Sequence, residues 1–363
     1  MSYQAADFSP QLNQKILSLA KHKKTIQLGS LTFSSPLLLA PMAGICSAPF
    51  RQLMQDLGAG GTVSELISCH GINYGNQLTL NMLKTMPHEK EVGIQLFGED
   101  AAAMAKAAQT TLEHGKAQFI DINMGCPVKK VVTKGGGSAL MKDLKKLPSF
   151  LAEVKKSIPV PLTIKIRTGW QDDDRNAAEI IKIASEEGIE WVAIHGRTRA
   201  QQYTGRADWE FIENLAQKSA LPLIGNGDLH SAHSVYQRLQ KTHCRALMIA
   251  RGALRNPFIF LEGLSPCHQE SIFIGSDYWE VLQRLHFYLT AHFDRPSIQL
   301  IQFRKLAVWF AAGFANASHF RSQMFAAKGL QECLSICQDY FLSLQDRQKN
   351  INYDEIFMTS GHG

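Results

Sequence analysis

The sequence lacks any long hydrophobic run. Within its 363 residues no apolar stretch approaches the roughly 18 residues that a membrane-spanning helix needs, and residues 1–24 lack the hydrophobic centre of a signal peptide. Biased, low-complexity tracts are also missing, which excludes a fibrous or disordered chain. We therefore expect a globular, cytoplasmic protein with no membrane partner, and no feature of the sequence requires an obligate protein partner.

Cysteine is scarce as well. The chain has seven cysteines, and none belongs to a C-x-x-C pair. Their odd number and irregular spacing exclude a disulfide framework and predict that no metal is bound. Neither sign of charge dominates: 38 basic and 32 acidic side chains leave a net charge of +6, which permits a polyanionic partner without establishing one.

Short apolar segments of β-type composition recur along most of the chain. They cover residues 37–40, 62–64, 92–96, 119–123, 162–167, 191–195, 223–226 and 246–249. Helical patterns fill the intervals, for example at 101–114, 177–187 and 208–219, and a small hairpin precedes the series at 26–33. A strand followed by a helix, repeated eight times, predicts an α/β fold, a (β/α)8 TIM barrel over residues 26–265.

The strand pattern stops after residue 265. Residues 265–276 have the composition of a linker, and helical patterns follow at 278–293, 298–312, 318–327 and 329–342. We predict a C-terminal all-α helical bundle domain over residues 276–345. The remaining parts are an N-terminal extension, residues 1–25, and a C-terminal tail, residues 346–363.

Polar residues at the carboxyl ends of barrel strands are the candidates for a site, because the active sites of such barrels lie there. On the fifth predicted strand, alternation places Thr163, Lys165 and Arg167 on one face. Two cations that point into the barrel mouth imply an anionic ligand. Alternatively, both cations extend toward solvent or pair with Asp121 or Glu65.

Three loops add to this picture. Small residues after the seventh and eighth strands, in segments 224–228 and 247–253, are typical of the phosphate site of barrel enzymes, although plain tight turns would also explain them. After the fourth strand, Pro127 restricts Cys126 to an extended conformation and so fixes its thiol above the mouth. That thiol is a candidate acid or nucleophile, whereas we expect the other cysteines to be buried structural thiols.

Several stretches resemble the flavin-dependent tRNA-dihydrouridine synthases, and the bacterial B group most. The stretches are APMAGICSAPFR (40–51), GIQLFG (93–98), DINMGCPVKKVVTKGGGSALM (121–141), LTIKIRTGW (162–170), IHGRTRAQQYTGRADW (194–209), IGNGDL (224–229) and MIARGALRNP (248–257). In the helical part, FRKLAVWF (303–310) is similar to the family's basic and aromatic RNA-contact helix.

The resemblance implies bound FMN, NADPH as the reductant and the D-loop of tRNA as the substrate. Reduced FMN would pass a hydride to C6 of a uridine, and Cys126 would give a proton to C5. The flavin would be bound by Pro41, Met42, Ala43, Gln95, Lys165, His195, Asn226, Gly227, Asp228, Ala250 and Arg251. The RNA would be bound by Asn123, Arg167, Tyr203, Arg304 and Lys305. Ala250 stands where glycine is common in the family, so a positive φ there would be strained.

Other functions fit parts of the pattern. A flavin barrel that reduces or oxidises a free pyrimidine would need no RNA-binding bundle. A flavin-free aldolase would use Lys165 as a Schiff-base lysine on a sugar phosphate. An RNA-binding module with a degenerate barrel is the alternative without catalysis, and the intact Cys126, Lys165 and His195 argue against it.

Overall fold

Eight parallel strands close into a barrel, as predicted. The structure is a computed structural model that describes residues 7–266, 271–344, 347, 349–353 and 357. Strand β10 pairs with both β3 and β9, so the order β10-β3-β4-β5-β6-β7-β8-β9 is closed. The strands are β3 (Leu37–Leu39), β4 (Thr62–Ser68), β5 (Val92–Phe97), β6 (Phe119–Asn123), β7 (Leu162–Arg167), β8 (Val192–His195), β9 (Leu223–Asn226) and β10 (Ala246–Ile249).

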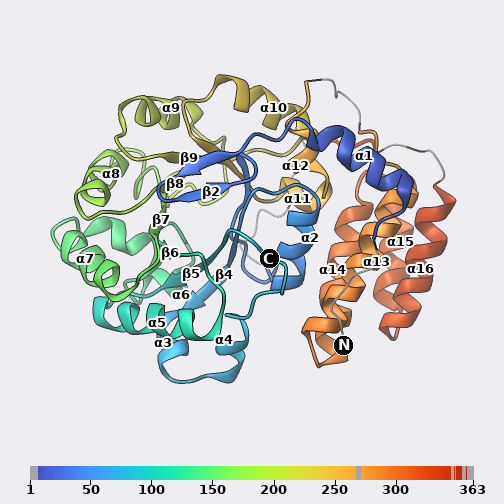
Figure 1. Cartoon of the computed structure of the whole chain (residues 1–363), viewed down its shortest axis with the longest axis horizontal. Helices are drawn as coiled ribbons and strands as arrows, with labels where there is room; N and C mark the ends of the chain where they lie inside the picture. The colour runs from blue at the N-terminus through green and yellow to red at the C-terminus, as the bar shows by residue number, and fades with distance from the viewer. Residues whose placement is uncertain (1–6, 267–270, 345–346, 348, 354–356, 358–363) are drawn as a thin grey trace.

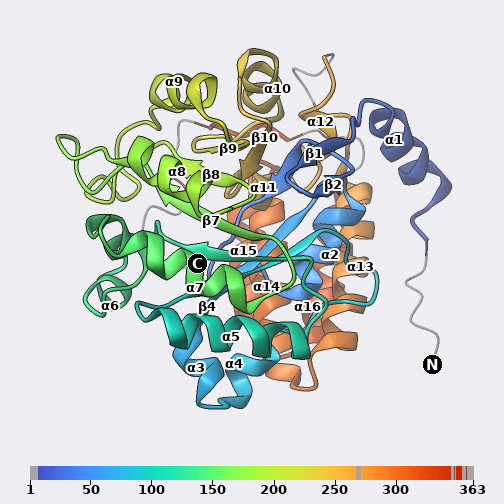
Figure 2. The ribbon, with the colours of Figure 1, turned by 60° about the vertical axis from the view of Figure 1, so that its left-hand side comes forward.

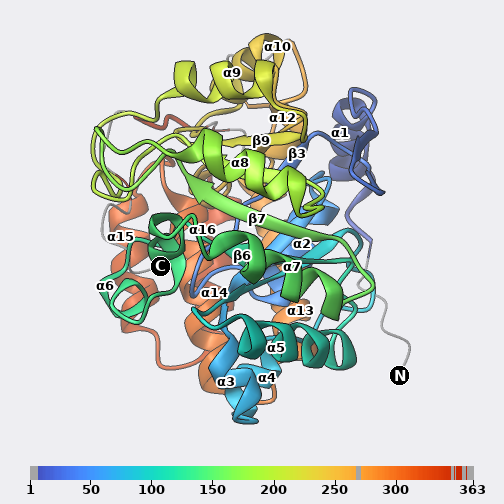
Figure 3. The same cartoon turned by 90° about the vertical axis from the view of Figure 1, so that its left-hand side faces the viewer.

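Helices surround the barrel and cover the outer faces of its strands (Figures 1 and 3). Ile164 and Ile166 of β7 are buried in the core that faces these helices, which confirms the alternation predicted for that strand. The helices are α2 (Ala48–Asp56), α3 (Cys69–Asn73), α4 (Gln77–Asn81), α5 (Ala101–His114), α6 (Lys129–Val132), the 3-10 helix η1 (Gly137–Lys142), α7 (Leu147–Ser157), α8 (Ala177–Glu186), α9 (Trp209–Lys218), α10 (Ala232–Lys241), α11 (Gly252–Arg255) and α12 (Ile259–Glu262).

Strand β4 is longer than the predicted segment 62–64. Its pairing with β5 shifts register between Val63 and Leu66, and then continues to Ser68. Such a bulge re-aims the side chains that lie within it. Glu65 lies in the bulge, and its direction could not be predicted from strand alternation.

Aromatic side chains plug the base of the barrel. The hairpin of β1 (Ile26–Leu28) and β2 (Leu31–Phe33) contributes Phe33, which makes edge contacts with Trp191 at 5.7 Å and Phe119 at 6.2 Å between ring centroids. Phe119 and Trp191 are 5.0 Å apart. This apolar plug leaves the opposite end of the barrel for polar side chains.

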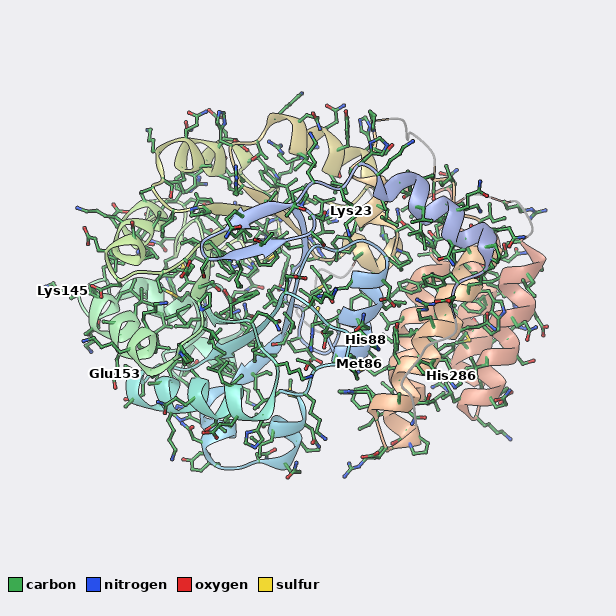
Figure 4. All side chains as sticks on the ribbon, in the orientation of Figure 1. Lys23, Met86, His88, Lys145, Glu153 and His286 are labelled. Atoms are coloured by element: carbon green, nitrogen blue, oxygen red, sulfur yellow. The ribbon has the colours of Figure 1, made fainter. Side chains whose placement is uncertain are left out.

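The C-terminal helices form a bundle beside the barrel (Figure 1). They are α13 (Gly275–His292), α14 (Pro296–Ala311), α15 (Ala317–Ala326) and α16 (Leu330–Ser343). Tyr288 of α13 donates to Asp56 of α2 at 2.5 Å, and this contact joins the bundle to the barrel. Figure 4 shows Met86 and His88 on the side of the barrel next to the bundle, whereas Lys145 and Glu153 lie on the far side.

The N-terminal extension contains a helix, α1 (Pro10–Ala20), which lies at the edge of the molecule in Figure 2 and contacts α12 and the start of α13. Ser9 caps it and donates to Glu280 at 2.7 Å, and Lys15 pairs with Asp277 at 2.6 Å. Residues 1–6, and 267–270 of the predicted linker, lie outside the described residues. So does most of the predicted tail, although Lys349 is described and donates to the Arg255 carbonyl at 2.6 Å.

Replacing the plug should destabilise the barrel. We expect Trp191→Ala to lower the free energy of unfolding by about 3–5 kcal/mol, because it removes a buried aromatic side chain and leaves a cavity among rings. The matched control is Tyr74→Ala, where the ring is 86% exposed and the expected change is within about 0.5 kcal/mol. Urea unfolding measures both, and similar values for the two variants would contradict the plug.

Candidate active site

One cavity opens at the barrel mouth and brings together residues from the carboxyl end of every part of the sheet. The predicted residues that line it are Pro41, Met42, Ala43, Gln95, Asn123, Cys126, Lys165, Arg167, His195, Tyr203, Asn226, Gly227, Asp228, Ala250 and Arg251. Lining residues that were not predicted to contact a ligand are Ala40, Ile45, Leu66, Gly125, Pro127, Val128, Leu229, His230 and Met248. Arg304 and Lys305 lie elsewhere, in a groove of the bundle.

A chain of hydrogen bonds ties the Cys126 loop to the barrel wall. Buried Asp121 accepts from Thr163 Oγ1 and from Gln95 Nε2, each at 2.6 Å. Gln95 in turn accepts from Asn123 Nδ2 at 2.9 Å, and Asn123 Oδ1 accepts from the Cys126 N–H at 2.8 Å. Because strands β5, β6 and β7 all contribute, the position of Cys126 is fixed by the sheet.

The Cys126 thiol is half-buried and keeps its proton. Burial raises the pKa of the thiol, and the nearby Arg167 guanidinium opposes this only in part. At neutral pH the group is therefore a thiol rather than a thiolate. A neutral thiol can donate a proton, whereas a nucleophilic cysteine needs a lowered pKa.

The half-buried Lys165 side chain lines the cavity. Its Nζ donates to Asn226 Oδ1 at 3.1 Å. Burial and the charge of Arg167 together lower the pKa of Lys165 to about 8, although Asp121 opposes them. Asp121 and Glu65, the partners considered from the sequence, accept hydrogen bonds from other groups. A cation that is partly withdrawn from water and held by an amide oxygen favours an anionic ligand beside it.

Arg167 holds two loops together at the rim, the one after β6 and the one after β8. Its Nε donates to the Gly125 carbonyl at 2.7 Å, and its Nη1 donates to the carbonyls of Thr198 at 2.9 Å and Gln202 at 2.8 Å. Burial lowers its pKa to about 10. The Tyr203 ring lies 5.6 Å from the Arg167 guanidinium, so a planar cation and an aromatic ring border the entrance.

Arg197 is a buried site residue that the sequence analysis missed. It pairs with Asp228 at 2.8 Å and lies 3.3 Å from Nε2 of His195. Burial lowers the pKa of His195 well below its ordinary value, and neighbouring cations add to this, so the ring is neutral. Burial alone would raise the pKa of Asp228, but hydrogen bonds and the Arg197 charge outweigh it and lower the pKa. Arg197 lies two residues after the predicted site residue His195, and this spacing was the signal in the sequence that could have identified it.

The loops after β9 and β10 form the other end of the cavity. Gly227 has φ +134°, and a Cβ there would lie 2.6 Å from a neighbouring side chain. Asp228 has φ +50°, whereas Ala250 is not among the residues with positive φ, so the strain considered for Ala250 does not arise. Arg251 Nη1 donates to the Phe357 carbonyl at 3.1 Å.

A second hollow of about 840 Å³ lies on the bundle, between α14, α15 and the described part of the tail. Arg304, Lys305 and Arg321 line it, together with Trp309 and Phe325. Arg304 Nη2 donates to the Ala327 carbonyl at 2.7 Å. Basic and aromatic side chains in one groove are the surface chemistry that RNA requires.

The described part of the chain has neither a cluster of metal-ligating side chains nor a helix that could span a membrane. No group of three or more His, Cys, Asp or Glu side chains is placed to hold a metal ion there. Among the same residues, every helix is too short or too polar to cross a bilayer.

The fold and this cavity define the class of (β/α)8-barrel enzymes with a site at the carboxyl-end mouth. Solved structures with the same fold include histamine dehydrogenase from Rhizobium sp. 4-9 (TM-score 0.52, 11% identity, 72% of this chain and 50% of that chain). The amine oxidase HisD from Pseudomonas geniculata N1, which acts on 6-hydroxypseudooxynicotine, has a TM-score of 0.52 and 12% identity over 73% of this chain and 53% of that chain. Our chain thus spans about half the length of each.

Sequence comparison is more specific. The model of the dihydrouridine synthase (Dus) family matches residues 38–346. The tRNA-dihydrouridine synthase B of Pasteurella multocida is 38% identical over 90% of this chain and 99% of the relative. That of Pseudomonas aeruginosa is 35% identical, over 90% and 97%. The chain therefore belongs to the dihydrouridine synthase family, whose members are generally flavin-dependent, and it is an oxidoreductase with tRNA-dihydrouridine synthase activity by homology.

The thiol environment predicts how Cys126 reacts. Because Cys46, Cys69, Cys244 and two bundle cysteines are buried, we expect iodoacetamide to label Cys126 before any of them in the folded protein. Since burial raises the pKa of Cys126 above its ordinary value of 9.0, labelling should be slow at neutral pH and still accelerate above about pH 9. Peptide mapping with mass spectrometry measures this, with urea-unfolded protein as the control. A rate already maximal near neutral pH would contradict a protonated thiol.

Proposed function

We propose that this chain binds FMN, uses NADPH as the reductant and reduces the C5–C6 double bond of a uridine in the D-loop of tRNA. The observation that carries the proposal is the half-buried Lys165 ammonium and the protonated Cys126 thiol in one cavity. The first suits the electron-rich edge of a reduced flavin, and the second suits proton donation to carbon.

The chemistry of the cavity fits a flavin. Pro41, Met42 and Ala43 provide an apolar wall for the ring, and Gln95, Lys165 and His195 provide polar groups for its edge. Lys165 supports this fit best, because its ammonium lacks a carboxylate partner in the described contacts and would stabilise negative charge at the N1 and O2 edge.

The far end of the cavity suits the ribityl phosphate. Gly227 lines this end of the cavity, and because it has no side chain its backbone N–H can approach a ligand closely. Asn226, Asp228, Ala250 and Arg251 would complete this part of the site. The Asp228 carboxylate is neutralised by Arg197, which reduces its repulsion of a phosphate.

When bound, FMN supplies the hydride that adds to C6 of the uracil, and NADPH resupplies it. Cys126 donates a proton from Sγ to C5. One hydride and one proton together thus convert the C5–C6 double bond into a single bond. The resulting thiolate recovers its proton from solvent, which reaches the open mouth. The hydrogen-bonded chain from Asp121 to Cys126 keeps the donor in place, and such positioning is itself a large part of catalysis.

The substrate uridine has to leave the RNA stack to reach this depth, which costs least in a loop. Asn123, Arg167 and Tyr203 would contact the uracil at the entrance, where Arg167 and Tyr203 lie side by side. Arg304 and Lys305 would contact the phosphates nearby, together with Arg321 in the same groove.

The first experiment uses purified holoenzyme, NADPH and unmodified tRNA. We expect yellow protein that forms dihydrouridine in the D-loop. Cys126→Ala should keep FMN affinity within about twofold and lower the rate of product formation about 10²–10⁴-fold, because one proton donor is lost. Reduction of the flavin by NADPH should be unchanged.

Three outcomes would reject the proposal. Full turnover by Cys126→Ala would remove this thiol from the mechanism. Activity on free uracil or orotate, with none on tRNA, would favour a free-pyrimidine enzyme. A colourless protein that forms a borohydride-trapped adduct at Lys165 would favour an aldolase.

The groove gives a separate prediction. We expect Arg321→Met to weaken tRNA binding about two- to fivefold and to reduce the slope of log affinity against log salt by about 1, because one phosphate contact is lost. Lys106→Met, on the exposed face of α5, is the control and should leave both unchanged. Filter binding between low and moderate salt measures this. An unchanged slope for Arg321→Met would place the RNA elsewhere.

A further inference from the structure

Gly44 is held from both sides by residues of different domains. It lies in the loop between β3 and α2, directly after Pro41, Met42 and Ala43, which form the apolar wall of the cavity. Its N–H donates to Glu65 Oε2 at 2.5 Å, and its carbonyl accepts from Lys305 Nζ at 2.5 Å. Charged side chains thus bind both the N–H and the carbonyl of this one residue.

The loop needs glycine at this point. Gly44 has φ +71°, a left-handed conformation that other residues adopt only with strain. Such a turn exposes its N–H and carbonyl in different directions. Partners on two sides can then hold Gly44. The turn at Gly44 in turn sets the position of Pro41, Met42 and Ala43, which precede it.

Glu65 reaches Gly44 because of the bulge in β4. The register shift between Val63 and Leu66 directs Glu65 toward the loop, while Leu66 lines the cavity. Burial raises the pKa of Glu65, and the Gly44 N–H and the charge of Lys305 oppose this. The Gly44 N–H and the Lys305 ammonium therefore both stabilise the charged form of the Glu65 carboxylate.

Lys305 comes from the bundle. It lines the groove on α14, 5.6 Å from the Trp309 ring centre, yet its ammonium crosses to the barrel loop. Burial lowers its pKa, and Glu65 raises it. The groove and the cavity wall therefore share one ammonium group.

We propose that Lys305 and Glu65 are positioning residues that clamp Gly44 and so hold the 41–44 wall against the flavin. The clamp consists of contacts within the chain and needs no ligand. Its effect on flavin binding rests on the proposed function. Lys305 then has a role in the enzyme without RNA, in addition to any phosphate contact. A purely RNA-binding lysine would have no such role.

The test compares two variants. Lys305→Met keeps the length of the side chain but removes its charge and its hydrogen-bond donor, whereas Lys305→Arg keeps a charge and a donor. Hydrogen exchange of peptides covering residues 41–46 is measured with and without FMN, and FMN affinity is measured by fluorescence, all without RNA. We expect Lys305→Met to speed exchange about tenfold and weaken FMN binding about five- to twentyfold. Lys305→Arg should restore most of both, and Lys106→Met should change neither.

The proposal is overturned if Lys305→Met leaves exchange and FMN affinity within about twofold of the wild type and weakens only tRNA binding, as Arg321→Met should. If Lys305→Met does not fold, Lys305→Gln is judged by the same two measurements. If the wild-type protein binds no FMN, the proposed function fails, while the exchange of residues 41–46 still decides whether the clamp exists.

Discussion

Closure of eight parallel strands is the constraint on which the rest of the structure depends. It brings all the carboxyl ends to one rim, where backbone and side-chain polar groups have to find partners away from bulk water. The aromatic plug of Phe33, Phe119 and Trp191 fills the other end. The rim is therefore the part of the barrel where Lys165 and Cys126 can face a shared cavity.

Within that cavity the electrostatics are divided. Burial, helped by the charges of Lys165, Arg167, Arg197 and Arg251, keeps His195 neutral, and burial also keeps Cys126 protonated. The same burial that makes these charges costly strengthens their interaction with an anionic ligand. The dihydrouridine synthase family assignment and the chemistry of the cavity thus support the same proposal by independent routes.

Much of this was predictable because it rests on local patterns. Alternation in β7 placed Lys165 and Arg167 inside and Ile164 outside, and the bundle helices begin and end within a few residues of the predicted bounds. The predicted segment 62–64 was too short because a bulge is set by pairing with β5, not by local composition. Helix α1 was missed although Ser9 at its N-cap and Pro10 after it are a local start signal, and its contacts with Glu280 and Asp277 of α13 are visible only in the tertiary structure.

The sequence by itself determined the order of the barrel strands and bundle helices, the faces of a regular strand such as β7, and the motifs that mark the family. Only the tertiary structure decided which side chains share a partner. Arg197 beside Asp228, and Glu65 and Lys305 on opposite sides of Gly44, are contacts between segments far apart in the chain. Their distances depend on barrel closure and domain docking, and neither is encoded in the periodicity of any one segment.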